Sequence, residues 1–186
     1  MQVNLYDFDN TIYKGDSSTD FFFYSLMKYP KVIKYLPRII KSGVLYKFKR
    51  INKTKMKENI FSFLEVIPDV DNLVSEFWES HSCYIKDFYL KKRHNKDIIV
   101  SASPEFLLKP ITDELKVMDL IASDVNKKTG KFNKPNCYGK EKVIRLNKKY
   151  KDIKVNESYS DSLSDTPILK LAKKAYIVKG NKLTDF

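Results

Sequence analysis

Short apolar runs, each followed directly by polar residues, recur through the C-terminal half of the chain. Residues 98–100 (Ile-Ile-Val) end at Ser101, and residues 120–125, which open with Leu-Ile-Ala and continue with Ser-Asp, predict a further strand. Runs of this length with polar boundaries are typical of buried strands. Helices are predicted over residues 104–115, 139–149 and 167–174, and further strands over a segment ending at Tyr159 and over residues 175–178. Strands that alternate with helices predict a parallel α/β sheet.

The N-terminal half has a different pattern. Residues 3–6 predict a short buried strand that ends at Asp7. Residues 53–66 and 70–89 instead place apolar side chains at helical spacing, with no convincing strand between them. We therefore predict an α/β core made of residues 1–13 and 93–186, interrupted by an all-helical insertion over residues 14–92.

Composition is that of a folded chain of one domain with an insertion. Of 186 residues, 42% are hydrophobic and 13% aromatic, with only 5 Gly and 7 Pro, which excludes disordered and collagen-like classes. Cys83 and Cys137 are far apart, so neither a disulfide framework nor a zinc site is indicated. No apolar run approaches the ~20 residues of a membrane span. We expect a cytoplasmic protein, soluble or peripheral to the inner face of the membrane.

Positive charge is concentrated in one segment. The chain has 35 basic and 23 acidic residues, a formal charge of +12. Residues 21–57 contain 11 of the basic residues and no acidic one, which leaves 24 basic against 23 acidic elsewhere. Nearly all of the net charge therefore belongs to the predicted helical insertion.

On a helical wheel, the charged and the apolar side chains of this segment lie on opposite sides, and Pro37 is expected to kink or divide the helix. One side carries Lys31, Lys34, Arg38 and Lys41, and the other carries Val32, Ile33, Leu36 and Ile40. Two interpretations stay open: a helix that packs its apolar face inward and solvates its lysines, or a basic amphipathic surface for anionic membrane or a phosphorylated substrate. No DNA- or RNA-binding motif accompanies the charge, so specific nucleic-acid binding is not expected.

Acidic pairs follow two of the predicted strands. Asp7 and Asp9 come directly after the first strand, and Asp161 and Asp165 follow the strand that ends at Tyr159. In open parallel sheets the functional crevice lies beyond the carboxyl ends of the strands. Four carboxylates that meet there without basic partners would repel one another, so a cation is the natural counter-charge. Hard oxygen ligands of this kind favour Mg²⁺.

Groups that could bind phosphate occur at the same strand and helix ends. Ser101 ends a strand and could donate to a phosphate oxygen, and Lys140 or Lys142 could bring positive charge from the start of a helix. Neither a Walker phosphate loop nor GxGxxG is present. The only histidines are His81, in the helical insertion, and His94, just after it, so a Ser-His-Asp hydrolase is not indicated.

Together these motifs resemble the haloacid dehalogenase superfamily of phosphohydrolases over almost the whole chain. Residues 7–11 (Asp-Phe-Asp-Asn-Thr) are similar to its DxDx(T/V) motif, residues 98–101 to its strand ending in Ser or Thr, and residues 161–165 to its DxxxD loop. The insertion resembles the type-1 cap, and residues 101–105 (Ser-Ala-Ser-Pro-Glu) resemble the branch with phosphoserine phosphatases, subclass IB. The fold implied is a Rossmann-like parallel sheet with an all-helical cap.

The resemblance also implies residue roles. Asp7 is the implied nucleophile, and Asp9 the acid that protonates the leaving group and then deprotonates water. Asp7, the backbone carbonyl of Asp9 and Asp161 are the implied Mg²⁺ ligands, with Asp165 orienting the ion's water shell. The implied substrate contacts are Thr11, Asp16, Ser101 and Ala102. A carboxylate that attacks a phosphate dianion meets like-charge repulsion, which Mg²⁺ and a lysine offset.

Some details depart from the family pattern or stay open. Phosphoserine phosphatases align best with Lys140, whereas a G-x-x-K pattern points to Lys142, the residue we prefer. Ser160 stands where glycine is common. Asp16 matches an acidic residue that binds the substrate amine in phosphoserine phosphatases. The arginine that binds the carboxylate of phosphoserine in those enzymes has no evident counterpart in this sequence.

The predicted function is Mg²⁺-dependent hydrolysis of a phosphomonoester through an aspartyl-phosphate, on a small phosphorylated metabolite or a phospholipid headgroup. The alternative is a phosphotransferase, or a non-catalytic protein whose basic cap binds anionic membrane or nucleic acid. No oligomeric state is predicted.

Overall fold

A computed structural model describes residues 1–186 and contains one six-stranded sheet, in the order β3-β2-β1-β4-β5-β6. Strands β1 to β5 are parallel, and β6 pairs antiparallel to β5. The strands are β1 (Gln2–Tyr6), β2 (Asp97–Pro104), β3 (Asp119–Ser123), β4 (Lys154–Ser160), β5 (Ala172–Lys179) and β6 (Lys182–Asp185). The predicted α/β class is thereby confirmed.

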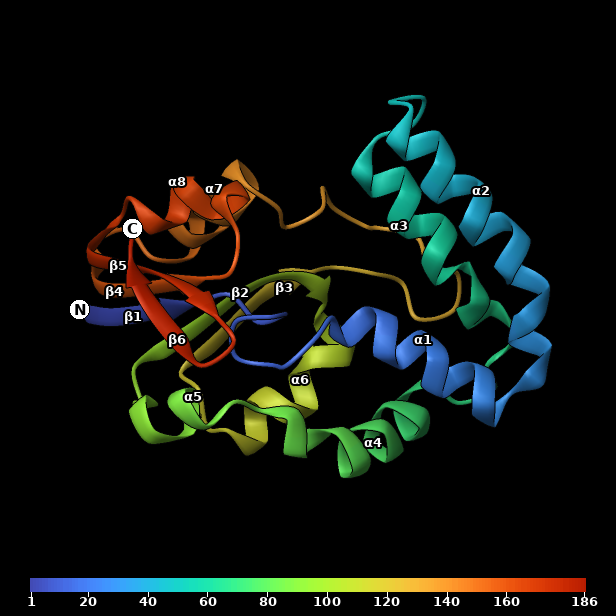
Figure 1. Cartoon of the computed structure of the whole chain (residues 1–186), viewed down its shortest axis with the longest axis horizontal. Helices are drawn as coiled ribbons and strands as arrows, with labels where there is room; N and C mark the ends of the chain where they lie inside the picture. Colours follow the sequence, from blue (N-terminus) through green and yellow to red (C-terminus); the bar gives the residue numbers. More distant parts are fainter.

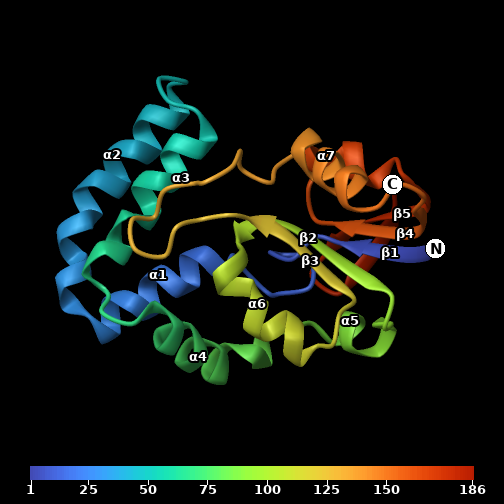
Figure 2. The same cartoon turned by 180° about the vertical axis from the view of Figure 1, so that it is seen from behind.

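Helices cover both faces of this sheet (Figures 1 and 2). Helices α7 and α8 lie over one face, and α5 and α6 lie under the other. Helix α4 lies beside α6 and below α1, while α2 and α3 stand away from the sheet. The helices are α1 (Ser17–Lys28), α2 (Leu36–Lys47), α3 (Lys53–Phe61), α4 (Val70–His81), α5 (Asp87–Lys92), α6 (Glu105–Glu114), α7 (Lys140–Lys149) and α8 (Thr166–Leu169). None of them is long and apolar enough to cross a membrane.

Strand β1 occupies the centre of the sheet because its side chains are buried on both faces. Val3 is 2% exposed and Tyr6 1% exposed, although they point to opposite faces. The chain passes from β1 to β2 on one side and later enters β4 on the other. This reversal of strand order opens a crevice at the carboxyl end of β1, the usual ligand position in such sheets.

The long helix predicted over residues 70–89 is interrupted. Helix α4 ends at His81, and α5 begins only at Asp87. Between them Ile85 forms an antiparallel bridge with Tyr13, and the backbone N–H of Lys86 donates to the carbonyl of Ile12. These tertiary hydrogen bonds require extended backbone, which a continuous helix would not offer.

A second difference concerns the predicted helix over residues 167–174. Helix α8 ends at Leu169, and β5 begins at Ala172, where Ala172 is paired with Val155 and Lys174 with Glu157 of β4. Ladder hydrogen bonds to a neighbouring strand thus override the local helical pattern. The hairpin to β6 turns at Gly180, whose φ of 60° suits glycine.

The basic segment also differs from an inward-packed helix. A 3-10 helix (Pro30–Tyr35) precedes α2, and Pro37 lies in the first turn of α2, where its missing N–H costs no helical hydrogen bond. Val32 is buried, but Ile33 and Ile40 are 58% and 59% exposed. The apolar face expected from the wheel is therefore only partly buried.

The largest apolar cluster joins the helical insertion to the sheet. It contains Phe21, Phe63 and Phe77 from the insertion together with Tyr6 and Ile99 from the strands. One continuous cluster thus spans both sequence segments. The division into a core (1–13 and 93–186) and a cap (14–92) stays a prediction about sequence organisation.

Two neighbouring phenylalanines of α1 provide a matched test of this packing. Phe21 is fully buried, whereas Phe23 is 57% exposed. We expect Phe21→Ala to lower the free energy of unfolding by about 3–5 kcal/mol, because it leaves a cavity in the cluster. Phe23→Ala should change it by no more than about 0.5 kcal/mol. Urea unfolding measures both; equal effects would contradict the packing described.

Candidate active site

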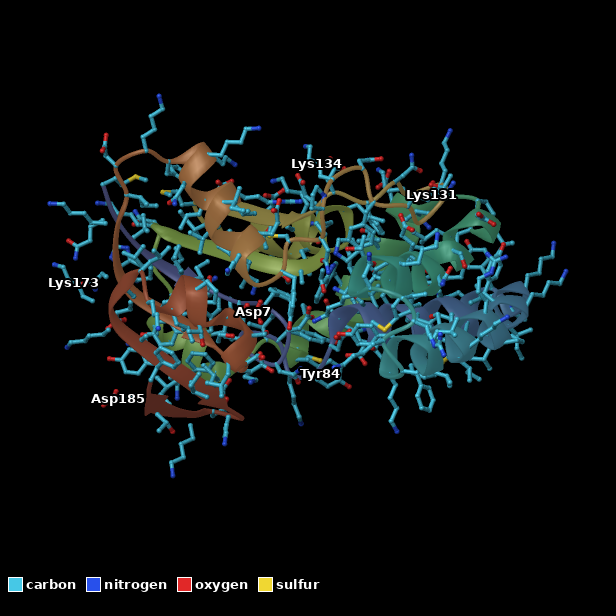
Figure 3. The ribbon with its side chains drawn as sticks, turned by 90° about the horizontal axis from the view of Figure 1, so that it is seen from above. Asp7, Tyr84, Lys131, Lys134, Lys173 and Asp185 are labelled. Carbon is cyan, nitrogen blue, oxygen red and sulfur yellow. The ribbon has the colours of Figure 1, made fainter.

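The carboxyl ends of three neighbouring strands bring the predicted polar residues to one edge of the sheet. Asp7 follows β1, Ser101 lies in the last half of β2, and Asp161 follows β4. The backbone N–H of Asp7 donates to the carbonyl of Tyr159 at 2.9 Å, which ties the two strand ends together. Seen from above, Asp7 lies between the sheet and the helical insertion (Figure 3).

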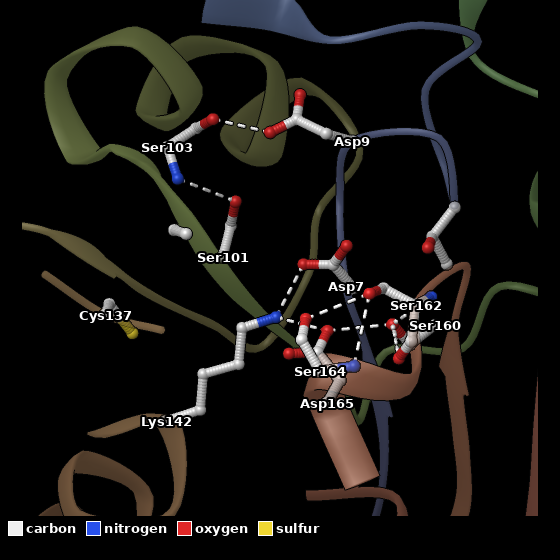
Figure 4. Close-up of polar contacts among 12 residues, drawn as sticks. Asp7, Asp9, Ser101, Ser103, Cys137, Lys142, Ser160, Ser162, Ser164 and Asp165 are labelled. Carbon is white, nitrogen blue, oxygen red and sulfur yellow. Dashed lines mark hydrogen bonds and ion pairs between the residues drawn. The ribbon is translucent and has the colours of Figure 1, made fainter. Parts of the chain in front are cut away.

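Lys142 is the basic centre of this edge. Its Nζ lies 2.7 Å from Oδ1 of Asp7 and 2.6 Å from Oδ2 of Asp165, and its side chain is 3% exposed (Figure 4). Gly139, with a φ of 57°, precedes α7 and lets the chain turn into the helix that carries this lysine. Lys140 is exposed to solvent at the start of α7.

The two carboxylates keep Lys142 charged. Burial alone would lower the pKa of Lys142, but Asp7 and Asp165 outweigh that effect and raise it above its usual range. Ser160, the residue that stands where glycine is common, donates its hydroxyl to Oδ2 of Asp165 at 2.7 Å. The departure from the family pattern thus gives Asp165 a second hydrogen-bond donor.

Asp9 has no ion-pair partner and is held by neutral hydrogen-bond donors. Its carboxylate accepts the backbone N–H of Ser17 at 2.7 Å and the hydroxyl of Ser103. Burial, and next the charge of Asp16, raise the pKa of Asp9 to about 7, although both serine donors lower it. A carboxyl with this pKa exchanges a proton readily near neutral pH.

The loop after β1 is held by contacts from distant segments. Thr11 is fully buried, and its hydroxyl accepts the backbone N–H of Asp161 at 2.9 Å. Asn10 adopts a left-handed φ of 56°, and its carbonyl accepts the ammonium of the buried Lys86. Asp16 caps α1 by accepting the N–H of Thr19 at 2.8 Å. The Thr11 hydroxyl therefore ties this loop to the residue that follows β4.

These groups line a cleft of about 390 Å³ between the strand ends and α3. Asp7, Asp9, Asp16, Lys142, Asp161 and Asp165 form its polar side, and Lys53, Met56, Lys57, Ile60 and Phe61 of α3 form the opposite side. Ala102 lines the cleft as well, and its carbonyl accepts the ammonium of Lys57 at 2.7 Å. Ser101 is fully buried behind it, and its Oγ accepts the N–H of Ser103.

The acidic side chains offer a suitable but open site for Mg²⁺. Asp161 is half-buried, no other residue donates to its carboxylate, and burial, then Asp7 and Asp165, raise its pKa to about 6. No three acidic side chains enclose an ion on their own. Mg²⁺ usually takes one or two carboxylates and keeps several waters, so the donor set around Asp7 and Asp161 fits it.

Several residues of the cleft were not singled out from the sequence. Ser103 bonds to Asp9, and Lys53 lies 3.4 Å from the ring centre of Tyr138. Ser103 stands two residues after Ser101, so the alternation of a strand could have placed both on one face. Lys53, Lys57 and Tyr138 reach the cleft from α3 and from the loop before α7, which no local pattern could show.

Known proteins resemble this chain in sequence. The haloacid dehalogenase-like hydrolase family matches residues 5–170. Protein CicA of Caulobacter vibrioides is 35% identical over 83 residues, which span 41% of this chain and only 37% of CicA. The chain thus aligns with about a third of that relative.

Solved structures share the fold at low sequence identity. A protein of unknown function from Bordetella pertussis Tohama I has a TM-score of 0.79 at 19% identity, covering 94% of this chain and 88% of that one. A phosphoserine phosphohydrolase-like protein from Francisella tularensis has a TM-score of 0.59 at 18% identity, with coverages of 94% and 86%. A probable phosphoserine phosphatase from Vibrio cholerae has a TM-score of 0.69 at 10% identity, covering 94% of this chain and 55% of that one.

The chain belongs to the haloacid dehalogenase-like hydrolase family. This match confirms the predicted superfamily. The structural neighbours confirm the predicted Rossmann-like fold and its likeness to phosphoserine phosphatases.

Lys140 and Lys142 form a matched pair for testing the buried ion pairs. Lys142→Met leaves Asp7 and Asp165 buried without their cation, so we expect the free energy of unfolding to fall by about 3–5 kcal/mol. Lys140→Met removes an exposed charge and should change it by no more than about 0.5 kcal/mol. Urea unfolding in excess EDTA keeps metal from compensating. Equal stability of the two variants would contradict the position given to Lys142.

Proposed function

We propose that the protein is a Mg²⁺-dependent phosphatase that hydrolyses phosphomonoesters through an aspartyl-phosphate on Asp7. The main support for this proposal is the arrangement of Asp7 and Lys142 at the carboxyl end of β1. Oδ1 of Asp7 lies 2.7 Å from the buried ammonium of Lys142. That cation offsets the repulsion between a carboxylate and a phosphate dianion.

In the first step an Asp7 carboxylate oxygen forms a bond to phosphorus, and the bond from phosphorus to the ester oxygen breaks. Asp9 gives its proton to the leaving oxygen, which departs as an alcohol. The pKa of about 7 suits this task, because the carboxyl is protonated in part of the molecules at neutral pH. Ser103 and the N–H of Ser17 keep the Asp9 carboxyl turned toward the cleft.

In the second step water attacks phosphorus, and the bond between phosphorus and the Asp7 oxygen breaks. Asp9 takes a proton from that water, which restores both carboxyls and releases inorganic phosphate. Asp7, the backbone carbonyl of Asp9 and Asp161 would hold Mg²⁺, and Asp165 would orient its waters. When bound, the ion neutralises charge on the phosphate oxygens. Ser101 and the backbone around Ala102 would bind the phosphate.

The α3 side of the cleft indicates which phosphoester fits. Lys53 and Lys57 face the acidic strand ends, and the cleft of about 390 Å³ admits a small molecule or a headgroup. A second anionic group on the substrate would pair with these lysines, while Asp16 offers a carboxylate to a substrate amine. A small phosphorylated metabolite and a phospholipid headgroup both meet these requirements.

Removal of the nucleophile tests the covalent mechanism. Asp7→Asn should lower turnover of p-nitrophenyl phosphate at least about 10⁴-fold, the scale seen when a catalytic nucleophile is lost. Asp185→Asn, an exposed carboxylate in β6, is the control and should keep full activity. Retention of more than a small fraction of activity by Asp7→Asn would overturn the mechanism.

Metal binding can be measured without turnover. Saturating Mg²⁺ at about 100 times its Kd stabilises a binding protein by about 2.7 kcal/mol, or roughly 5–10 °C in Tm for a chain of this length. We expect that rise in the EDTA-treated protein and expect its loss in Asp161→Asn. Asp185→Asn should behave as wild type. If Mg²⁺ raised the Tm of Asp161→Asn as much as that of the wild type, the ion would bind elsewhere.

A further inference from the structure

Helix α2 turns an apolar stripe toward solvent. Ile40 and Val44 of α2 and Phe48, the residue that caps its C-terminus, follow one another at intervals of four residues and are 59%, 50% and 70% exposed. Residues at this spacing lie above one another on a helix. The other side of α2 packs inward through the buried Ser42 and the half-buried Ile39. Single exposed apolar side chains are ordinary, but a continuous stripe marks an interaction surface.

Basic residues border this stripe on both edges. At 100° per residue, Lys47 lies on one edge of the arc formed by Ile40, Val44 and Phe48, and Lys41 lies on the other. Arg38 continues the basic edge beyond Lys41. All three basic side chains are exposed and have no ion-pair partner. The outer face of α2 is thus an apolar band between two positive margins.

The position of α2 leaves this face uncovered. Helix α3 lies between α2 and the rest of the protein, so the outer side of α2 forms the edge of the molecule (Figures 1 and 2). The surrounding segment, residues 21–57, contains 11 basic residues and no acidic one. No carboxylate of that segment competes for these cations or repels an anionic partner.

We propose that the outer face of α2 docks onto an anionic lipid bilayer. Ile40, Val44 and Phe48 enter the boundary between headgroups and acyl chains, while Lys41 and Lys47 extend their ammonium groups to lipid phosphates. Charge complementarity selects this occupant, because a protein partner would have to supply acidic residues at both margins of one narrow apolar band. The surface lies outside the cleft, so the proposal does not depend on hydrolysis.

Sedimentation with vesicles tests this docking. The full chain, without Mg²⁺ or substrate, is mixed with vesicles of phosphatidylglycerol and phosphatidylcholine in equal parts, and separately with pure phosphatidylcholine. We expect binding to the anionic vesicles only. Raising NaCl from about 0.1 M to about 1 M, which shortens the Debye length from about 10 Å to about 3 Å, should release the protein.

Paired variants separate the charged margins from the apolar band. Each basic residue near an anionic surface strengthens binding about fivefold, so Lys41→Gln with Lys47→Gln should weaken it about 25-fold. Ile40→Thr with Val44→Thr keeps branching at Cβ and removes apolar area, and should weaken it at least about tenfold. The controls are Lys148→Gln with Lys173→Gln and Ile144→Thr, which change exposed residues elsewhere and should bind as wild type.

A fluorescent reporter locates the contact. The one tryptophan, Trp78, is 4% exposed, so its emission should be insensitive to vesicles. Phe48→Trp should add an emission band that shifts to the blue with anionic vesicles. No sedimentation at low salt, or binding unchanged in the Ile40→Thr/Val44→Thr variant, would overturn the proposal. Concentration-dependent self-association lost in that variant would overturn it in favour of a second copy of the chain.

Discussion

A buried ammonium between two carboxylates connects the main parts of the site. Lys142 reaches from α7 to Asp7 at the end of β1 and to Asp165 beyond β4. Asp7 and Asp165 repel each other in an environment of low polarity, and the cation between them turns that repulsion into attraction. The positions of α7, β1 and the loop after β4 are therefore coupled through one charge.

The position of Lys142 also gives the two carboxylates of the first motif, Asp7 and Asp9, different surroundings. Asp7 faces a cation, and Asp9, two residues later, receives hydrogen bonds from the hydroxyl of Ser103 and the N–H of Ser17. This difference suits the proposed roles, in which Asp7 attacks phosphorus and Asp9 transfers protons. Environment assigns them, since the two side chains are chemically identical.

The helical insertion has two functional faces in this interpretation. Its inner helix, α3, brings Lys53 and Lys57 to the cleft, and its outer helix, α2, presents an apolar band with basic margins. A phospholipid headgroup phosphate would use both faces, whereas a soluble metabolite would need only the inner one. The concentration of basic residues in this segment thus has two separate structural explanations.

The sequence alone determined the parallel α/β class, the strand ends at Asp7 and Asp161, and the inserted helices, because these follow from local periodicity and from motifs of a few residues. Contacts between residues far apart in the sequence decided the remaining features, because local patterns hold no information about such contacts. The contact between Tyr13 and Ile85 breaks the predicted helix over residues 70–89, and pairing with β4 turns residues 172–174 into strand. Both lysines near the start of α7 fit the motif spacing, but only the helix direction in the folded chain buries Lys142 and leaves Lys140 in solvent. The position of α3 likewise determines which apolar residues of α2 face outward. That position depends on the packing of the whole apolar cluster, which a helical wheel of α2 alone does not contain.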